Sequence, residues 1–188
     1  GNDLNNSQLE SFLKVTNDID AECSMANSAA IMSLPKSHFE IVRPGIMLYG
    51  ASPFRDVSAA ELGLQPVMQF ETSLIDIKLV RAGESIGYGS SFTCNTDTSV
   101  GVVAAGYGDG YSRHAKNATP VWLNNHCCDL LGRVSMDSLC IDLNGVDANI
   151  GDRVVLWGEE LSVDKVADSC GTIAYELLCN AGAAYFAN

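Results

Sequence analysis

Long apolar runs, metal-ligand spacings and positive charge are all scarce in this 188-residue sequence. The longest apolar stretch, Val100 to Ala105, is interrupted by Gly101, whereas a helix that spans a bilayer takes about 20 apolar residues. Lysine and arginine number 11 against 23 aspartates and glutamates, so the formal net charge is −12 and phosphate backbones would be repelled. We therefore expect neither a membrane span nor a nucleic-acid partner.

Cysteine and histidine lack the spacings that mark a disulfide framework or a zinc site. The seven cysteines are odd in number and form no CxxC pair, and the three histidines lie far apart. Unpaired thiols are typical of a reducing compartment. We expect a cytoplasmic protein that binds no metal.

Residues 1–56 alternate between helical and strand patterns, the order of a parallel α/β structure. A capping box at the first helix and apolar residues at helical spacing support this reading. The predicted elements are a helix from about Ser7 to Val15, a strand at Ala21–Met25, a helix at Ser28–Ser33 and a strand at Phe39–Tyr49. An eight-stranded α/β barrel takes about 250 residues, so this part cannot close such a barrel alone. Its strand edges would need a preceding segment or another chain as cover.

Residues 57–188 have short strands punctuated by glycine turns, which predicts a mostly antiparallel β domain. We place the change of pattern between Ala51 and Gln65, with the domain boundary after residue 56. Further predicted elements are an alternating strand around Ile75–Leu79, a hairpin of Val121–Leu123 and Cys127–Leu131 around Asn124–His126, a strand at Val154–Trp157, and two short helices capped by Ser162 and Thr172.

Five short motifs carry the chemistry of the chain. They are Ala26-Asn27-Ser28-Ala29-Ala30, Val42-Arg43-Pro44-Gly45-Ile46, Ser85-Ile86-Gly87-Tyr88-Gly89-Ser90-Ser91, Gly106-Tyr107-Gly108-Asp109-Gly110-Tyr111 and Gly132-Arg133-Val134-Ser135-Met136-Asp137. A phenol between glycines, as at Tyr88, can be placed tightly against a reacting carbon. In order and spacing the five motifs resemble those of the alanine racemase family, and the resemblance covers nearly the whole chain.

The resemblance implies the C-terminal part of a pyridoxal-phosphate enzyme that interconverts L- and D-alanine, a supplier of D-alanine for the bacterial cell wall peptidoglycan. Members of the family have an N-terminal α/β barrel and a C-terminal β domain. They act as homodimers whose active sites take residues from both chains. The fold expected here is therefore the end of a (β/α)8 barrel followed by a mostly antiparallel β domain.

By the same resemblance, Arg43 faces the pyridine nitrogen of pyridoxal 5'-phosphate, and Ser28, Gly45, Ile46 and Tyr175 contact the phosphate. A guanidinium has only donors and stays protonated, which makes the ring a poorer electron sink and suits racemisation. Taken alone, Arg43 could equally cap a strand end, and Ser28 would be an ordinary N-cap.

Racemisation needs a base on each face of the α carbon. Tyr88 matches the family's tyrosine, which acts across the subunit contact opposite the lysine that carries the cofactor. The unperturbed pKa of tyrosine, about 10, is close to that of lysine, so the two groups can exchange roles. Met136 matches the position whose backbone amide binds the substrate carboxylate. Tyr107, Arg133 and Ile173 are expected to line the entry channel, which favours a small side chain.

The five lysines of the chain all lie in surface-like settings, and none fits the cofactor-bearing role. That lysine is expected upstream of residue 1, and the chain by itself is expected to be inactive. Two alternatives stay open: a racemase for serine or a broader set of amino acids, and a non-catalytic dimerisation or phosphate-binding module.

Overall fold

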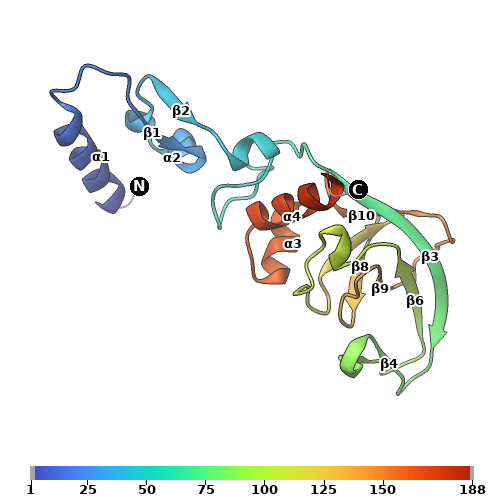
Figure 1. Ribbon diagram of the computed structural model, residues 1–188. Helices are drawn as coiled ribbons and strands as arrows, with labels where there is room; N and C mark the ends of the chain where they lie inside the picture. The colour runs from blue at the N-terminus through green and yellow to red at the C-terminus, as the bar shows by residue number, and fades with distance from the viewer. Residues whose placement is uncertain (1–2, 187–188) are drawn as a thin grey trace. The chain divides into compact units, whose positions relative to one another are not determined.

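The computed structural model describes residues 3–186 and divides into two compact units, Gly1–Leu64 and Gln65–Asn188 (Figure 1). The division falls at the end of the range, 51–65, in which the sequence changes pattern. The boundary after residue 56 itself stays a prediction. Within residues 3–186, every helix is too short or too polar to cross a membrane.

The first unit is a helix followed by a small parallel α/β segment. Its elements are α1 Asp3–Thr16, β1 Ser24–Asn27, α2 Ser28–Ser33, η1 Pro35–Ser37, β2 Ile41–Arg43 and η2 Ile46–Tyr49. β1 and β2 pair in parallel, as the predicted order of elements requires. The side chain of Asn27 caps α2 by accepting a hydrogen bond from the amide of Ala30 at 3.0 Å.

Three of the predicted elements in this unit were placed wrongly. The strand expected at Phe39–Tyr49 is confined to Ile41–Arg43, because Pro44 has no amide hydrogen to continue a ladder and a 3-10 turn follows it. The first helix begins at Asp3, so the capping box at Ser7 lies inside it. The strand expected at Ala21–Met25 is displaced to Ser24–Asn27.

The second unit is a closed six-stranded barrel in the order β10-β3-β6-β9-β8-β7, with every neighbouring pair antiparallel. The expected antiparallel β domain is thus confirmed. The strands are β3 Phe70–Val80, β6 Thr98–Val103, β7 Pro120–Leu123, β8 His126–Leu131, β9 Leu139–Asp142 and β10 Arg153–Trp157. The long β3 curves along the barrel in Figure 1, and inward side chains such as Leu74, Val121 and Leu130 are completely buried. A separate hairpin, β4 Ser85–Ile86 and β5 Phe92–Thr93, follows β3.

The predicted β7–β8 hairpin is present, with a loop one residue shorter than expected. Asn124 and Asn125 form the turn with φ of 47° and 64°, the left-handed conformation that asparagine tolerates in two-residue hairpins. His126 already pairs with Leu123. Two residues are therefore enough to reverse the chain.

Two helices, α3 Val163–Cys170 and α4 Ala174–Phe186, follow the last strand. The Ser162 hydroxyl caps α3 by accepting from the amide of Asp164 at 3.2 Å, as predicted. α4 begins two residues after Thr172, whose hydroxyl bonds the Glu176 carboxylate instead of capping the helix from the N-cap position.

Ala118, between the Gly106–Tyr111 motif and β7, adopts φ of 65°, a conformation that costs an alanine about 1–2 kcal/mol but a glycine very little. We expect Ala118→Gly to raise the melting temperature of the chain by roughly 2–4 °C in calorimetry. Asn125→Gly, at nearly the same φ of 64°, is the matched control. It should raise the melting temperature less, because asparagine already tolerates this conformation. A lower melting temperature for Ala118→Gly would contradict this account.

Candidate active site

Ser28 in the first unit forms the centre of a small cradle of backbone amides. Its side chain is buried, and Oγ accepts hydrogen bonds from the amide of Gly45 at 2.8 Å and of Met47 at 3.4 Å. A hydroxyl that accepts two bonds still has its own proton to donate. A β-carbon added at Gly45 would lie 3.7 Å from Ser28 Oγ, an ordinary van der Waals contact. The arrangement can present the Ser28 hydroxyl to an anion.

Ser28 is not the N-cap of α2, since Asn27 has that role. Its hydroxyl is thereby free for the Gly45–Ile46 turn, which comes from a segment more than fifteen residues later in the chain. Ile46 is the first residue of η2 and is buried. Because the first amides of a helical turn have no acceptor within that turn, the Ile46 amide is available to a ligand.

Arg43, the last residue of β2, is held across the parallel strand pair. Its guanidinium donates from Nη1 to Ser24 Oγ at 2.8 Å and from Nη2 to the Met25 carbonyl oxygen at 3.2 Å. The side chain therefore lies against β1 in a fixed direction, and the remaining donors of the exposed guanidinium stay free. Ser24 was not singled out by the sequence, because only the β1–β2 register brings it beside Arg43.

Tyr88 lies in the second unit at the start of the η3 turn, Tyr88–Ser90, between β4 and β5. It is 68% exposed and so is not a core tyrosine. The preceding Gly87 has φ of 78°, and a β-carbon there would come within 2.8 Å of the Arg133 nitrogen. The turn that carries Tyr88 therefore packs directly on the backbone of the Gly132–Arg133 segment.

Asn117 ties the same two segments together. Its Oδ1 accepts from the Gly132 amide at 2.7 Å, and its Nδ2 donates to the Ser91 carbonyl oxygen at 3.4 Å, just beyond the Tyr88 turn. Gly132 has φ of 75°, and a β-carbon on it would lie 2.8 Å from the Ile86 oxygen. Side-chain and backbone contacts together fix the base of the Tyr88 turn.

Met136 lies four residues along the same segment, and a second glycine turn packs against it. The Tyr107 amide donates to the Ser135 carbonyl oxygen at 3.0 Å, and the Gly108 amide donates to the Met136 carbonyl oxygen at 2.8 Å. Met136 is 54% exposed, so its side chain is not core filling. Residues 132–136 therefore connect the Tyr88 turn on one side to the Tyr107 turn on the other.

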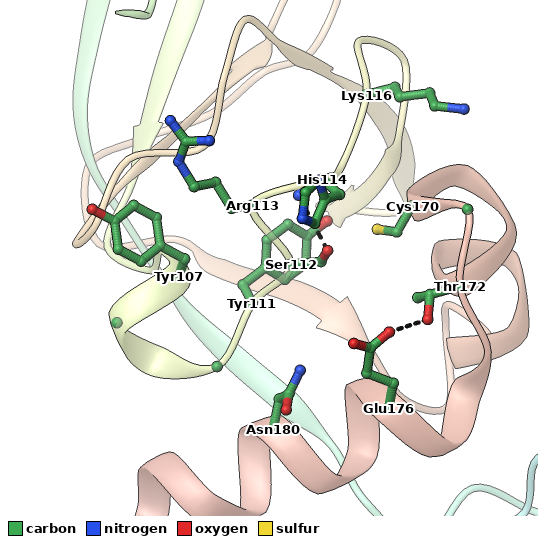
Figure 2. A pocket seen from close by; sticks show the side chains of 13 residues that line it. Tyr107, Tyr111, Ser112, Arg113, His114, Lys116, Cys170, Thr172, Glu176 and Asn180 are labelled. Carbon is green, nitrogen blue, oxygen red and sulfur yellow. Dashed lines mark hydrogen bonds between the residues drawn. The ribbon is translucent and has the colours of Figure 1, made fainter.

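A pocket of about 830 Å³ opens between the Tyr107 turn and the start of α4 (Figure 2). Tyr107 and Arg113 form one side, and Thr172, Glu176 and Asn180 lie on the other. The Arg113 guanidinium carbon lies 5.9 Å from the centroid of the Tyr107 ring, within reach of a cation–π contact. The pocket brings a cation, a carboxylate and an aromatic ring to one opening.

The other expected channel residues, Arg133 and Ile173, do not line this pocket. Arg133 lines a smaller pocket of about 400 Å³ that it shares with Arg113 and Asn117. Ile173 and Tyr175 are 62% and 46% exposed at the start of α4. Ser28, Arg43, Gly45 and Ile46 belong to the first unit, and the remaining site residues belong to the second.

Sequence reasoning missed the residues that act on the site through the fold. One of them, Arg113, lies two positions after the Gly106–Tyr111 motif, and this closeness in sequence is a signal that could have identified it. Asn117 and Ser24 give no local signal, because each reaches its partner only through strand pairing or loop packing. In the part of the chain that the structure describes, no group of three or more histidines, cysteines or carboxylates could hold a metal ion.

Burial raises the pKa of a second tyrosine, Tyr111, which lines the 830 Å³ pocket. Tyr111 is 2% exposed, stacks on Trp157 with ring centroids 6.0 Å apart, and its hydroxyl has no hydrogen-bond partner among the described residues. Desolvation raises its pKa far above the usual range. Tyr111 and Tyr88 are thus at opposite extremes of environment, although both follow glycine.

The cradle in the first unit is suited to bind an anion, and the exposed, glycine-held tyrosine in the second unit is suited to exchange a proton. The sequence model described as the alanine racemase C-terminal domain matches residues 67–186, and the one described as the alanine racemase N-terminal domain matches residues 2–53. The chain therefore belongs to the alanine racemase family.

Relatives of known name and structure agree. The alanine racemase of Vesicomyosocius okutanii is 50% identical over 176 residues, which are 93% of this chain and 49% of that protein. The crystal structure of the biosynthetic alanine racemase from Pseudomonas aeruginosa is 48% identical with a TM-score of 0.93, over 96% of this chain and 51% of that one. The alanine racemase from Bartonella henselae, described with covalently bound pyridoxal phosphate, is 31% identical with a TM-score of 0.85, over 96% and 50%. The chain spans about half the length of the relatives it matches.

Gly87 and Gly89 offer a matched pair for testing how the Tyr88 turn is held. Both have positive φ, 78° and 70°, but only Gly87 lies against backbone, whereas nothing is within 4 Å of a β-carbon at Gly89. Gly89→Ala should cost about 1–2 kcal/mol for its φ alone. Gly87→Ala should cost about 1–3 kcal/mol more, because the added carbon overlaps Arg133. Denaturant unfolding measures both, and equal losses would contradict the packing described.

Proposed function

We propose that the protein to which these residues belong is an alanine racemase that interconverts L- and D-alanine with pyridoxal 5'-phosphate. The observation that carries the proposal is the exposed Tyr88 on a turn packed against the segment that bears Met136, in a chain of this family. D-alanine is a component of bacterial cell wall peptidoglycan, and the proposed role is its supply.

The first unit fits the cofactor at two points. The Ser28 hydroxyl and the Ile46 amide suit a phosphate, which takes several donors at once, and Gly45 is assigned to the same group, its amide holding Ser28 Oγ at 2.8 Å in this structure. Arg43 is aimed by Ser24 and Met25, and it suits a ring nitrogen that accepts a hydrogen bond. Tyr175 is assigned to the phosphate as well. When bound, the cofactor withdraws electrons from the α carbon of the amino acid and makes its proton removable.

Tyr88 is proposed to take or return that proton on one face of the α carbon. A lysine outside this chain would serve the opposite face, since all five lysines here are exposed and none adjoins the Ser28 cradle through a described hydrogen bond. The close packing of Gly87 and the Asn117 bridge keep the turn that carries Tyr88 in place, while the phenol itself is exposed. A fixed, unburied phenol can exchange protons in both directions.

The Met136 amide is proposed to bind the substrate carboxylate. Tyr107, Arg133 and Ile173 are proposed to narrow the approach to it, which favours a methyl side chain over larger ones. A racemase of broader range, including serine, is distinguished by assaying a panel of amino acids.

Exposed apolar side chains support a larger assembly. Ile41 and Val42 of β2 are 43% and 39% exposed, and Leu48 is 60% exposed, as expected if further strands of an α/β barrel cover them. Tyr88 and Met136 in the second unit would face a neighbouring subunit of a homodimer. All seven cysteines are free thiols, in keeping with the proposed cytoplasmic location.

The 188-residue chain alone is expected to show no racemase turnover with added cofactor, because no lysine in it fits the second base. Incubation with L-alanine and pyridoxal 5'-phosphate followed by chiral chromatography measures this. Sustained formation of D-alanine would show that one of the five exposed lysines had been assigned wrongly.

A complete protein can be built by joining this chain behind the remaining half of the Pseudomonas aeruginosa enzyme, which is 48% identical. We expect this chimaera to racemise alanine and Tyr88→Phe to lower its kcat about 10²–10⁴-fold, the usual contribution of a general acid or base. Tyr111→Phe is the control. It removes a buried hydroxyl that has no described partner, so activity and stability should be kept. Full activity of Tyr88→Phe would refute the assigned role, and an inactive chimaera that binds cofactor would favour the non-catalytic module.

A further inference from the structure

The turn Gly106–Gly110 holds the peptide group that contains the Met136 amide, and Asp109 holds the turn. We propose that Asp109 is a positioning residue for carboxylate binding: its side chain fixes the turn, and the turn fixes the direction of the Met136 N–H. The inference rests on the proposed function, since it assumes that this amide binds the carboxylate of the amino acid.

The Ser135 carbonyl and the Met136 N–H belong to the same peptide group, whose atoms are coplanar and whose N–H points opposite to its carbonyl. The Tyr107 amide donates to that carbonyl at 3.0 Å. Fixing the carbonyl therefore fixes the N–H on the other side, and a bond at the carbonyl also polarises the N–H as a donor.

The next peptide group is held by the same turn. Its carbonyl, that of Met136, accepts from the Gly108 amide at 2.8 Å. Both peptide groups that flank the Met136 α carbon are thus bonded to successive residues of the Tyr107 turn. A rotation of the segment about Met136 would break both hydrogen bonds, and a flip of the Ser135–Met136 peptide alone would break the one from Tyr107.

Gly106 makes this approach possible because it has no side chain. A β-carbon there would lie 2.2 Å from the Met136 oxygen and 2.3 Å from the Ser135 oxygen, which no real β-carbon tolerates. The backbone of Gly106 is extended, so the glycine is required by the contact and not by its dihedral angles. The backbone of the Gly106–Gly110 turn therefore lies directly against the backbone of Ser135 and Met136.

Asp109 fixes the turn internally. Its Oδ2 accepts from the Gly106 amide at 2.9 Å, while its own amide donates to the Gly106 carbonyl oxygen at 3.1 Å. At the other end, a β-carbon on Gly110 would lie 2.6 Å from the Asn180 oxygen of α4. The carboxylate therefore closes a turn that is clamped between α4 and the Met136 segment. A charged acceptor holds an amide more strongly than a neutral one.

The test uses the chimaera described above and two ligands that separate the ends of alanine. Propionate has the carboxylate and the methyl group but no amine, and ethylamine has the amine but no carboxylate. For Asp109→Ala we expect the Kd of propionate to rise about tenfold, because the hydrogen bond from the Met136 amide to the charged carboxylate is weakened. Titration calorimetry measures this Kd. The inhibition constant of ethylamine should change less than about twofold. KM for alanine should rise more than kcat falls.

Two further variants separate positioning from general damage. Asp109→Asn keeps an acceptor at the same place and should restore propionate binding to within about threefold of the parent, because an amide oxygen can still accept from Gly106. Asp152→Ala is the matched control, since Asp152 Oδ2 accepts from the Asn149 amide three residues earlier at 2.8 Å, in a turn that carries no site residue. It should lower the melting temperature without changing the ratio of the two ligand affinities.

The possible outcomes are distinct. If Asp109→Ala does not fold, Asp109→Ser provides the second route, since it keeps a short polar side chain in the turn but removes the carboxylate that accepts from the Gly106 amide, and it should also weaken propionate selectively. Equal weakening of both ligands, or unchanged propionate binding, in a folded variant of an active chimaera would overturn the inference alone. A parent chimaera that neither racemises alanine nor binds propionate would overturn the proposed function instead.

Discussion

The site depends on close backbone contact along residues 132–136. On one side, a β-carbon at Gly87 would come within 2.8 Å of the backbone nitrogen of Arg133. On the other, a β-carbon at Gly106 would come within 2.2 Å of the carbonyl oxygen of Met136. Glycine is therefore the residue that lets two turns reach one segment. Because this segment bears Met136 and supports Tyr88, the proposed acid/base and the proposed carboxylate-binding amide are positioned by the same piece of backbone.

The parts of the fold that the sequence predicted are those set by local chemistry. The hairpin around Asn124, the cap at Ser162 and the antiparallel β domain follow from turn residues, capping hydroxyls and alternating apolar positions. The strand expected at Phe39–Tyr49 was too long because an apolar run does not distinguish a strand from a 3-10 turn. Pro44, which has no amide hydrogen to donate, ends the strand at Arg43. Barrel closure was not foreseen, since it needs the pairing of β10 with β3 and β7, far apart in the chain.

The site divides in the same way. Glycine-flanked Tyr88 and the Arg43 motif were recognisable because their residues are consecutive. The residues that hold them were not, since Ser24, Asp109 and Asn117 reach their partners through register and loop packing. Ser28 is an example: taken alone it would be an ordinary helix cap, yet Asn27 caps α2 and the Ser28 hydroxyl accepts from the Gly45 amide. A motif identifies the group that reacts, and the tertiary contacts decide where it points.

The most direct test of this account is a crystal structure of the complete protein with cofactor and propionate. The account predicts that the Met136 N–H donates to the propionate carboxylate, that the Tyr107 amide still bonds the Ser135 carbonyl oxygen, and that the Tyr88 hydroxyl faces the same bound molecule. A structure in which Tyr88 and Met136 face different cavities, or in which the Ser135–Met136 peptide is turned away from the carboxylate, would contradict it.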